Sequence, residues 1–477
     1  MDSARSDCFG SYGADRGLTP NLDEFAEESL VCENFYAAGS GSALSHVAIF
    51  SGQHSSRTGI VHNLSELKDS IQSIPEILSR KKDYKAYGMA KIIQPPVGYE
   101  DEFGFDELVY PRTGSKDKDN VPIRKRMIDQ LRKYPRLWTF IKFCFTKTFG
   151  TSILLKQTAS HFDGKSSLDY LYKKITSIKS NPLFLYSTIL HPHTPYCPPD
   201  WAIKKVFGNE NVDQLAYEIQ TDQHAWLNGN YGDADDAMKD MKRLYDAELL
   251  YGDHLVGEFL NKLKSSGEFD ESLIIITGDH GEMFGEHGEI NHGATVYNEV
   301  IKVPLIIKFP GSSIKRKTSK LCSHLDILPT IMNYLKIDIS DEDEMDGEDI
   351  LNDNSDRNLI IDSPPLVLPG RLSHYPSIVE KYSVFWRCII DQNYKYVWRS
   401  DGVQYLYERN GYEKESNNII QAEESRAKSM KEIMISRYKS FNKSFDMNEY
   451  PINIGPKAAQ FMTSPRIIRE LKKEGYL

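Results

Sequence analysis

Three apolar segments of this chain each end in side chains that can do chemistry. In chain order these side chains are Lys91, His193 and the adjacent pair Asp279 and His280. Ligands of open α/β sheets bind at the carboxyl ends of the strands, so we expect these residues to meet at one rim of a sheet. An amine, two imidazoles and a carboxylate gathered on such a rim are typical of a catalytic site.

The Asp279–His280 pair is a candidate metal site. Adjacent oxygen and nitrogen ligands at a strand end suit a divalent cation that takes a mixed ligand set. His280 has two alternative roles, as a general base or as a side chain that fixes the loop by hydrogen bonds. Glu286, His287 and His292 extend this loop of titratable residues.

A candidate nucleophile lies in the segment 39–52, where glycines lead into a short predicted helix. The candidates are Ser40, Ser42 and Ser45, because a helix N-terminus stabilises anions and activates a nucleophile. The alternative is an ordinary helix N-cap, for which Ser45 is the best placed. The segment is not a P-loop, because no Gly-Lys-Ser or Gly-Lys-Thr follows it.

The elements that must position these residues follow from the apolar pattern. Strands are predicted at Tyr84–Ala90, Leu183–Leu190, Ser272–Thr277 and Val303–Phe309. The clearest helix starts at Met241 and continues with apolar residues at helical spacing until Ser265-Ser266-Gly267 stops it. This alternation predicts an α/β fold with a mainly parallel central sheet flanked by helices.

The composition changes at 338–349, an acidic stretch typical of a loop or linker. Beyond it, segments at 384–390, 394–399 and 404–409 alternate apolar and polar residues between turn signals. We therefore predict a catalytic domain at 1–337 and a C-terminal subdomain at 338–477. The subdomain is expected to hold a small antiparallel meander and a charged helical tail.

The segment 112–180 departs from the strand–helix alternation and is predicted to be a helical insert. Its part at 124–156 is rich in Lys and Arg interleaved with aromatic residues. The favoured interpretation is a cap whose aromatic side chains pack on the core, because apolar periodicity usually means packing. The less favoured alternative is a basic amphipathic surface that contacts a membrane or a polyanion.

Composition argues against several classes of protein. The 477 residues carry a formal charge of −10, which argues against a dedicated nucleic-acid binder. The six cysteines are scattered and form neither a disulfide framework nor a zinc motif. No apolar run reaches the length of a membrane-spanning helix, about 18 residues, and Met1 is followed by no signal peptide. The sequence as written therefore predicts a cytoplasmic protein, and it carries no signal of an oligomeric state.

Taken together and in order, these segments resemble the sulfatase family of the alkaline phosphatase superfamily. Ser42-Ala-Leu-Ser-His46 falls on the nucleophile motif, and Thr277-Gly-Asp-His-Gly-Glu282 falls on a later block. The other matching segments are Asp2–Gly13, Thr19–Asp23, Pro192–Tyr196, Gly285–Gly288, Val303–Gly311 and Leu325–Thr330. The resemblance implies an alkaline-phosphatase-like α/β fold with a small C-terminal antiparallel sheet.

The resemblance also implies roles for the candidate residues. One divalent cation, calcium in most sulfatases with manganese, magnesium and zinc as alternatives, would be bound by Asp2, Asp279 and His280. Ser42 would stand at the nucleophile position. The residues that would hold the anionic ester and assist the leaving group are Lys91, His193 and His292. His292 stands where sulfatases usually have a lysine.

Three departures from the family pattern bear on the chemistry. Sulfatase nucleophile motifs are Cys-x-Pro-x-Arg or Ser-x-Pro-x-Arg, with the first residue oxidised to formylglycine. Here Leu44 replaces the proline and His46 replaces the arginine. Ser3 stands where a second metal-binding aspartate often lies, which predicts a cation site with one carboxylate ligand fewer. Asp2 should follow a central hydrophobic strand, so we expect the true start to lie upstream, and localisation then stays open.

The expected function is metal-dependent hydrolysis of a small-molecule or glycan sulfate ester, by attack of residue 42 on sulfur. One alternative is a phosphodiesterase, a phosphonate monoester hydrolase or a phospho-headgroup transferase, in which unmodified Ser42 forms an intermediate that water cleaves. Another alternative is a pseudo-enzyme that binds glycans without turnover. Metal ligands beside a nucleophile count against this alternative, because a pure binding protein has little need of them.

Overall fold

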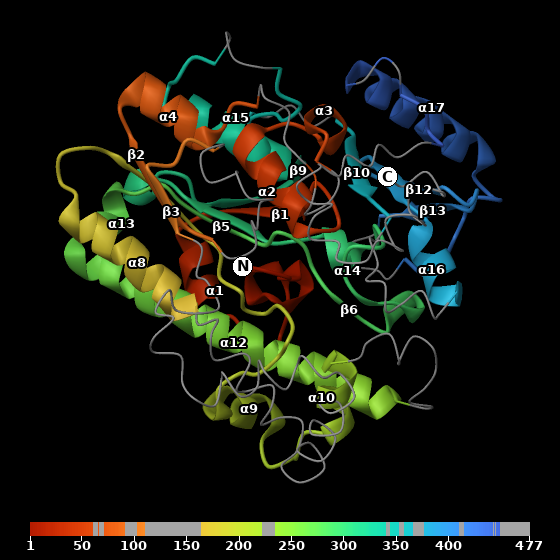
Figure 1. Ribbon diagram of the computed structural model, residues 1–477, viewed down its shortest axis with the longest axis horizontal. Helices are drawn as coiled ribbons and strands as arrows, with labels where there is room; N and C mark the ends of the chain where they lie inside the picture. The colour runs from red at the N-terminus through yellow and green to blue at the C-terminus, as the bar shows by residue number, and fades with distance from the viewer. Residues whose placement is uncertain are drawn as a thin grey trace, which may run out of the picture.

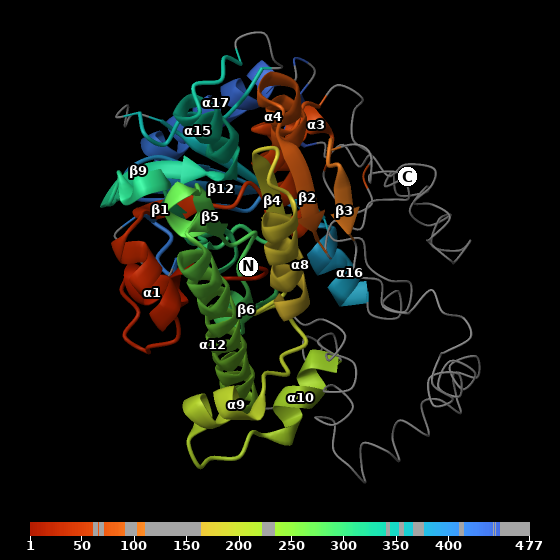
Figure 2. The ribbon, with the colours of Figure 1, turned by 90° about the vertical axis from the view of Figure 1, so that its left-hand side faces the viewer.

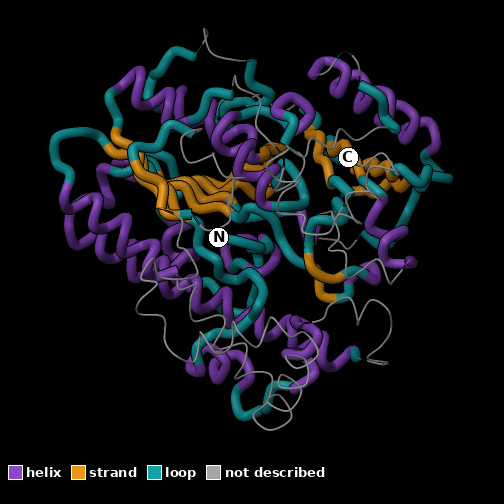
Figure 3. Tube along the Cα trace, viewed as in Figure 1, coloured by secondary structure: helices purple, strands orange, loops and turns teal. Residues whose placement is uncertain are grey.

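The computed structural model describes residues 1–60, 65, 71–90, 103–109, 164–221, 234–339, 344–352, 357–365, 376–409, 415–441, 443 and 445–448. Lys91 and the basic segment 124–156 lie outside these residues, so their roles stay predictions. The described part forms a central group of strands between two layers of helices, with a second sheet beside it (Figures 1 and 3).

The central strands form two ladders. In spatial order, the four-stranded ladder holds β5 (Ile274–Thr277), β8 (Leu305–Lys308), β1 (Leu30–Tyr36) and β9 (Arg316–Ser323). The three-stranded ladder holds β3 (Glu107–Val109), β2 (Lys85–Met89) and β4 (Leu183–Ser187). All pairs are parallel except those of β8, which is antiparallel to β5 and to β1. The predicted α/β fold is confirmed.

The direction of β8 follows from the connection that precedes it. Between β5 and β8 the chain forms only the hairpin of β6 (Met283–Phe284) and β7 (Ile290–Asn291) and the short helix α14 (Asn298–Ile301). A parallel return needs a crossover, usually a helix laid across the sheet. Because these short elements do not cross the sheet, the chain re-enters it from the same end.

Helices cover both faces of the central strands (Figure 1). On one face lie α2 (Ser42–Ser51), α4 (Ile74–Lys82) and α15 (Ile327–Tyr334). On the other lie α1 (Pro20–Glu27), α8 (Gly164–Ser177) and α12 (Asp235–Ser266), and Figure 2 shows α8 and α12 side by side. Further short helices in this part of the chain are α3 (Ser55–Thr58), α9 (Asp200–Phe207), α10 (Gln214–Thr221) and α13 (Glu268–Glu271).

The long helix α12 shows how the sequence sets these elements. Its apolar stripe, which includes Leu244, Leu249, Leu255 and Leu260, is buried in a core shared with α1. Gly267 ends the helix with φ of 78°, a conformation that glycine adopts without strain, as the Ser-Ser-Gly stop predicted. Within the described residues no helix is both long and apolar enough to cross a membrane.

The C-terminal sheet is antiparallel throughout. Its strands, in spatial order, are β10 (Leu359–Ser363), β11 (Trp386–Ile390), β12 (Tyr394–Arg399) and β13 (Gln404–Glu408). The three predicted strands of the meander are confirmed, and α16 (Pro376–Ser383) and α17 (Glu424–Phe441) accompany them. The fourth strand, β10, was missed because its sequence, Leu-Ile-Ile-Asp-Ser, does not alternate between apolar and polar residues.

Candidate active site

Ser42 is the first residue of α2, and Gly41 precedes it in an extended conformation. The Ser42 side chain is 5 % exposed, and its Oγ lies 3.1 Å from Nε2 of His280. The positive end of the helix dipole therefore lies beside this hydroxyl and favours an oxyanion there. The alternative that Ser45 is an N-cap is wrong, because the helix begins at Ser42. The buried hydroxyl of Ser45 has no hydrogen-bond partner among the described residues.

Gly278 and Gly281 flank the Asp279–His280 pair that follows β5. A Cβ on Gly278 would lie 2.8 Å from the carbonyl oxygen of Ala4, and one on Gly281 would lie 2.0 Å from that of Glu299. Both contacts are too short for any side chain, so only glycine fits on either side of the pair. The backbone of the Gly-Asp-His-Gly segment therefore packs closely against the neighbouring backbone on both sides of the pair.

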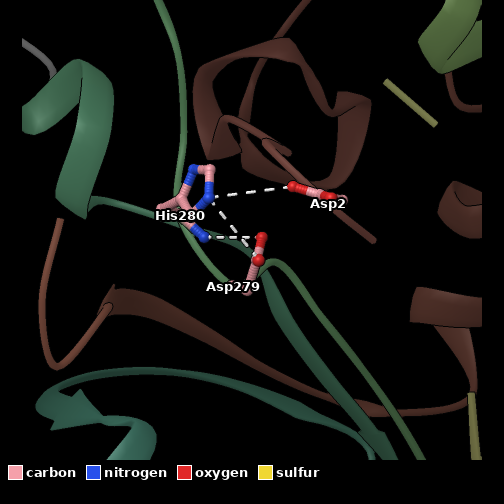
Figure 4. Close-up of side chains that lie close together, drawn as sticks. All are labelled: Asp2, Asp279 and His280. Atoms are coloured by element: carbon pink, nitrogen blue, oxygen red, sulfur yellow. Dashed lines mark hydrogen bonds and ion pairs between the residues drawn. The ribbon is translucent and has the colours of Figure 1, made fainter. Parts of the chain in front are cut away.

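Hydrogen bonds fix the tautomer of His280. Its Nδ1 lies 2.9 Å from the carbonyl oxygen of Gly281, which can only accept, so Nδ1 donates and Nε2 presents a lone pair. That Nε2 lies 3.6 Å from Oδ2 of Asp279 and 3.7 Å from Oδ1 of Asp2 (Figure 4). Burial lowers the pKa of His280 to about 4, so the ring is neutral near pH 7.

Backbone hydrogen bonds hold Asp2 between the ends of two strands. The α-amino group of Met1 donates to the carbonyl oxygen of Thr277 at 2.8 Å, and the Asp2 amide donates to that of Ile189 at 2.9 Å. The Asp279 amide in turn donates to the carbonyl oxygen of Met1 at 3.4 Å. Asp2 therefore lies at the carboxyl ends of both β4 and β5, where the sheet geometry predicts the site.

No Lys or Arg among the described residues pairs with the carboxylates of this rim, and the buried α-amino group of Met1 is the positive group that acts on both. Asp2 and Asp279 form ion pairs there only with histidines, and their Oδ2 atoms are buried without hydrogen-bond partners. Burial and the nearby Asp279 carboxylate raise the pKa of Asp2. Single ligand atoms of Asp2, Asp279 and His280 all lie within 4.8 Å of one another. Two orphaned carboxylate oxygens and an imidazole lone pair at this spacing fit a divalent cation.

A second group of rings lies against this set. His292 stacks on His280 with ring centroids 4.0 Å apart, and His193 meets His292 edge-on at 5.3 Å. Nδ1 of His292 donates to Oε1 of Glu282 at 3.1 Å, and the Tyr196 hydroxyl donates to Oε2 of the same carboxylate at 3.1 Å. Burial lowers the pKa of His193 and of His292 to about 4, so both rings are neutral at rest.

The structure brings six of the seven predicted site residues to this rim; the seventh, Lys91, lies outside the described residues. The six are Ser42, His193, His292, Asp2, Asp279 and His280. Other candidates have structural contacts instead. The hydroxyl of Ser40 donates to Ser363, Glu286 pairs with Arg5 at 2.8 Å, and His287 stacks on Tyr297.

Sequence reasoning missed several residues that surround the site. His46 was noted only as a replacement in the nucleophile motif, yet its Nε2 lies 3.6 Å from Oδ2 of Asp279. Glu282 was quoted within a motif without a role, and Tyr196 was quoted in the same way. Tyr186, whose hydroxyl contacts Nδ1 of His46 at 2.5 Å, belongs to a predicted strand and carried no signal at all.

Comparison with known proteins identifies the family. A family model described as Sulfatase matches residues 1–337. An arylsulfatase of Clostridium perfringens is 24 % identical over 370 residues, which cover 72 % of this chain and 75 % of that protein. A choline-sulfatase of Rhizobium meliloti is 24 % identical over 359 residues, which cover 72 % of this chain and 67 % of that protein.

Solved structures support the same fold. A phosphonate monoester hydrolase of Agrobacterium radiobacter superposes with a TM-score of 0.67 at 17 % identity, over 92 % of this chain and 94 % of that one. A protein solved with D-glucosamine-2-N,6-O-disulfate superposes with a TM-score of 0.65 at 18 % identity, over 94 % of this chain and 98 % of that one. With the family model covering most of the chain, this protein belongs to the sulfatase family.

Proposed function

We propose that this chain hydrolyses sulfate esters, with the residue at position 42 attacking the ester sulfur. The observation that carries the proposal is the position of Ser42 Oγ, 3.1 Å from His280 Nε2 and beside two carboxylates with orphaned oxygens. The names of similar proteins, arylsulfatase, choline-sulfatase and N-acetylglucosamine-6-O-sulfatase, support a small-molecule or glycan sulfate ester as substrate. Overall, the bond between sulfur and the ester oxygen breaks, water supplies the new sulfate oxygen, and the leaving oxygen gains a proton.

Sulfatases generally use a divalent metal, and Asp2, Asp279 and His280 are the residues that would hold it here. Calcium is the ion that the family resemblance implies, with manganese, magnesium and zinc as alternatives. When bound, such an ion lowers the pKa of a neighbouring hydroxyl and offsets charge on the transferred group. Ser42 itself is buried at the start of α2, which orients its Oγ and shields it from water.

We propose that His193 and His292 assist the departure of the leaving group. His193 or His292 would give a proton to the leaving oxygen. Both rings are neutral at rest, and the negative charge of a bound ester would favour their protonated forms. Glu282 accepts a hydrogen bond from Nδ1 of His292, so it fixes the ring and stabilises the imidazolium. Lys91 is proposed to hold the anionic ester.

A second candidate function is hydrolysis of a phosphodiester or phosphonate monoester, or transfer of a phospho-headgroup, by unmodified Ser42. The observation that favours it is the nucleophile motif, in which Leu44 and His46 stand in place of the proline and arginine. In this route the serine oxygen bonds to phosphorus as the ester oxygen leaves. Water then breaks the new serine–phosphorus bond and restores the hydroxyl.

Comparing an aryl sulfate with an aryl phosphonate monoester tests these functions, together with mass spectrometry of the peptide that contains Ser42. A faster aryl sulfate reaction and an aldehyde at position 42 support the proposal. A faster phosphonate reaction with plain serine supports the second candidate. Ser42→Ala should lower either rate by about 1000-fold or more, whereas Ser45→Ala, three residues along the same helix, should retain activity. Turnover of neither substrate by metal-loaded, folded protein would contradict both functions.

A further inference from the structure

We infer that His46 is a fourth ligand of the cation site, acting through its Nε2 atom. The inference rests on the proposed function only in taking this rim of the sheet as a cation site. His46 lies one turn after Ser42 on α2 and is buried on the same side of the helix. The element that carries the proposed nucleophile would thus also contribute to binding the cation.

The distances around Asp279 carry the inference. Oδ2 of Asp279 lies 3.6 Å from Nε2 of His280 and also 3.6 Å from Nε2 of His46. Two ligands about 2.1 Å from one tetrahedral ion are about 3.4 Å apart. A separation of 3.6 Å is by contrast too long for a hydrogen bond between a nitrogen and an oxygen. Each of the two imidazole nitrogens is therefore separated from this carboxylate oxygen by about the distance expected of two ligands of one ion.

Buried polar atoms that lack a hydrogen-bond partner also support a shared ion at this place. The buried polar atoms without a hydrogen-bond partner among the described residues include Nε2 of His46, Oδ2 of Asp279 and Oδ2 of Asp2. Leaving such atoms unsatisfied in a buried site is costly, and an ion would engage several of them at once. Among the described residues these three atoms are not satisfied by hydrogen bonds to one another.

Tyr186 fixes the orientation of the His46 ring. Its hydroxyl lies 2.5 Å from Nδ1. A phenol hydroxyl also accepts a hydrogen bond, so Nδ1 can donate to it and leave the lone pair on Nε2. Histidines that bind metals usually donate their other ring proton to a polar partner in this way.

Two departures from the family pattern complement each other, because one removes a ligand of the cation and the other supplies one. Ser3 removes a carboxylate from the expected site, and its hydroxyl instead donates to Oδ1 of Asp2 at 3.4 Å. His46 supplies a nitrogen ligand in its place. Calcium takes six to eight oxygen ligands, whereas imidazole nitrogens suit zinc, cobalt and related ions. The site of two carboxylates and two imidazoles is therefore inferred to prefer a transition ion over calcium.

The test is an X-ray absorption spectrum of the full chain, freed of metal and loaded with one equivalent of Zn²⁺. The expected spectrum shows two imidazoles bound to zinc in the wild type and one in His46→Gln. His46→Gln should also weaken Zn²⁺ binding by about 10- to 100-fold. His254→Gln, which removes an imidazole that is 48 % exposed on α12, is the matched control and should change neither result.

A single imidazole on zinc in the wild type would overturn the inference. An unchanged spectrum and affinity in His46→Gln would overturn it as well. The wild-type spectrum gives an answer even if the variant fails to fold. One imidazole together with sulfate ester hydrolysis that depends on Ser42 overturns only the ligand. Two imidazoles without any hydrolysis support the ligand and contradict the proposed function.

Discussion

The molecule buries a serine, a histidine and an aspartate together in two places. At the rim of the central sheet they are Ser42, His280 and Asp279. Beside the C-terminal sheet, the trio of Ser55, His54 and Asp362 is buried to the same degree. The residue types are identical, so the surroundings of each carboxylate must decide which cluster can do chemistry.

Asp362 is compensated by other protein groups. The hydroxyl of Ser55 donates to its Oδ2 at 3.1 Å, and the hydroxyl of Tyr438 donates to its Oδ1. The guanidinium of Arg387 lies 3.8 Å from the same Oδ1. Both oxygens of this buried carboxylate therefore have partners, and a cation is already in place. The cluster stabilises the junction between the C-terminal sheet and α17.

The rim of the central sheet has the opposite character. Asp2 and Asp279 lie side by side there, each keeps one orphaned oxygen, and no Lys or Arg of the described residues pairs with either. Buried charge without compensation is expensive unless a ligand supplies the missing charge. The comparison indicates that incomplete compensation of a buried charge by other protein groups, more than the residue types present, marks a functional site.

The largest expected effect is on activity, and it distinguishes Asp279 at the rim from Asp362 beside the C-terminal sheet. Asp279→Ala should remove bound divalent cation and lower turnover by about 1000-fold or more, because the cation's charge stabilisation is lost. The metal-free variant should be less stable than metal-free wild type, because Asp279 accepts hydrogen bonds from the backbone amides of Ser3 and His280. Although burial alone would raise it, the pKa of Asp279 is held well below its usual value by His280 and His46, so the ionised carboxylate stabilises the fold. Metal content by mass spectrometry, turnover and chemical denaturation check the three outcomes. Full activity after treatment with a chelator would contradict this assignment.

The second expected effect is on stability and concerns the compensated aspartate. Asp362→Ala should lower the free energy of unfolding by about 3–5 kcal/mol, because it removes the carboxylate whose charge compensates the buried Arg387 guanidinium. Where the variant is folded, its affinity for a divalent cation should equal that of wild type. Urea denaturation gives the first quantity and calorimetric titration the second. Loss of cation binding by folded Asp362→Ala would show that the two clusters are coupled.

The third expected effect is a pH dependence that is concentrated at the rim. Burial lowers the pKa of His193, His280 and His292 to about 4, against about 6.5 in an unfolded chain. Between these values the unfolded chain binds more protons, so the free energy of unfolding falls as pH falls from about 6.5 to about 4. Above about 6.5 this contribution is fully present. Denaturation of metal-free protein at pH 7 and pH 5 measures it, and His292→Gln should flatten the slope.

The smallest expected effect distinguishes a serine that caps a helix from one that does not. Ser73 forms a capping box with Glu76 at the start of α4, so Ser73→Ala should cost about 1 kcal/mol of stability. Ser45→Ala removes a buried hydroxyl without a partner among the described residues and should change stability by less than about 0.5 kcal/mol. Thermal denaturation of the pair compares them directly. Equal losses in both variants would contradict the helix start at Ser42.

Much of the architecture was accessible from sequence because the chemistry follows strands. Asp279 and His280 come directly after β5, and His193 comes shortly after β4, so a rule about strand ends sufficed to bring them together. The alternating strands of the C-terminal meander were accessible for the same reason. The strand β10 was not predicted, since its residues do not alternate between apolar and polar. The strand β8 was predicted, but its antiparallel direction was not, because that direction depends on the connection before it.

The surroundings of the site were beyond sequence reasoning because they are long-range contacts. Tyr186 and His46 are separated by 140 positions, and Tyr196 and Glu282 by 86. Nothing in the local pattern around a tyrosine in a strand indicates which histidine it will meet. The motif showed that His46 replaces an arginine, but only the fold shows that its ring faces Asp279.

Anomalous diffraction from crystals grown with Mn²⁺ tests the central claim most directly, since it locates the cation without reference to turnover. One anomalous peak is expected per chain, within bonding distance of Asp2, Asp279 and Nε2 of His280, with Ser42 Oγ beside it. No peak at this rim, in crystals that contain Mn²⁺ at saturating concentration, would contradict the assignment of the site.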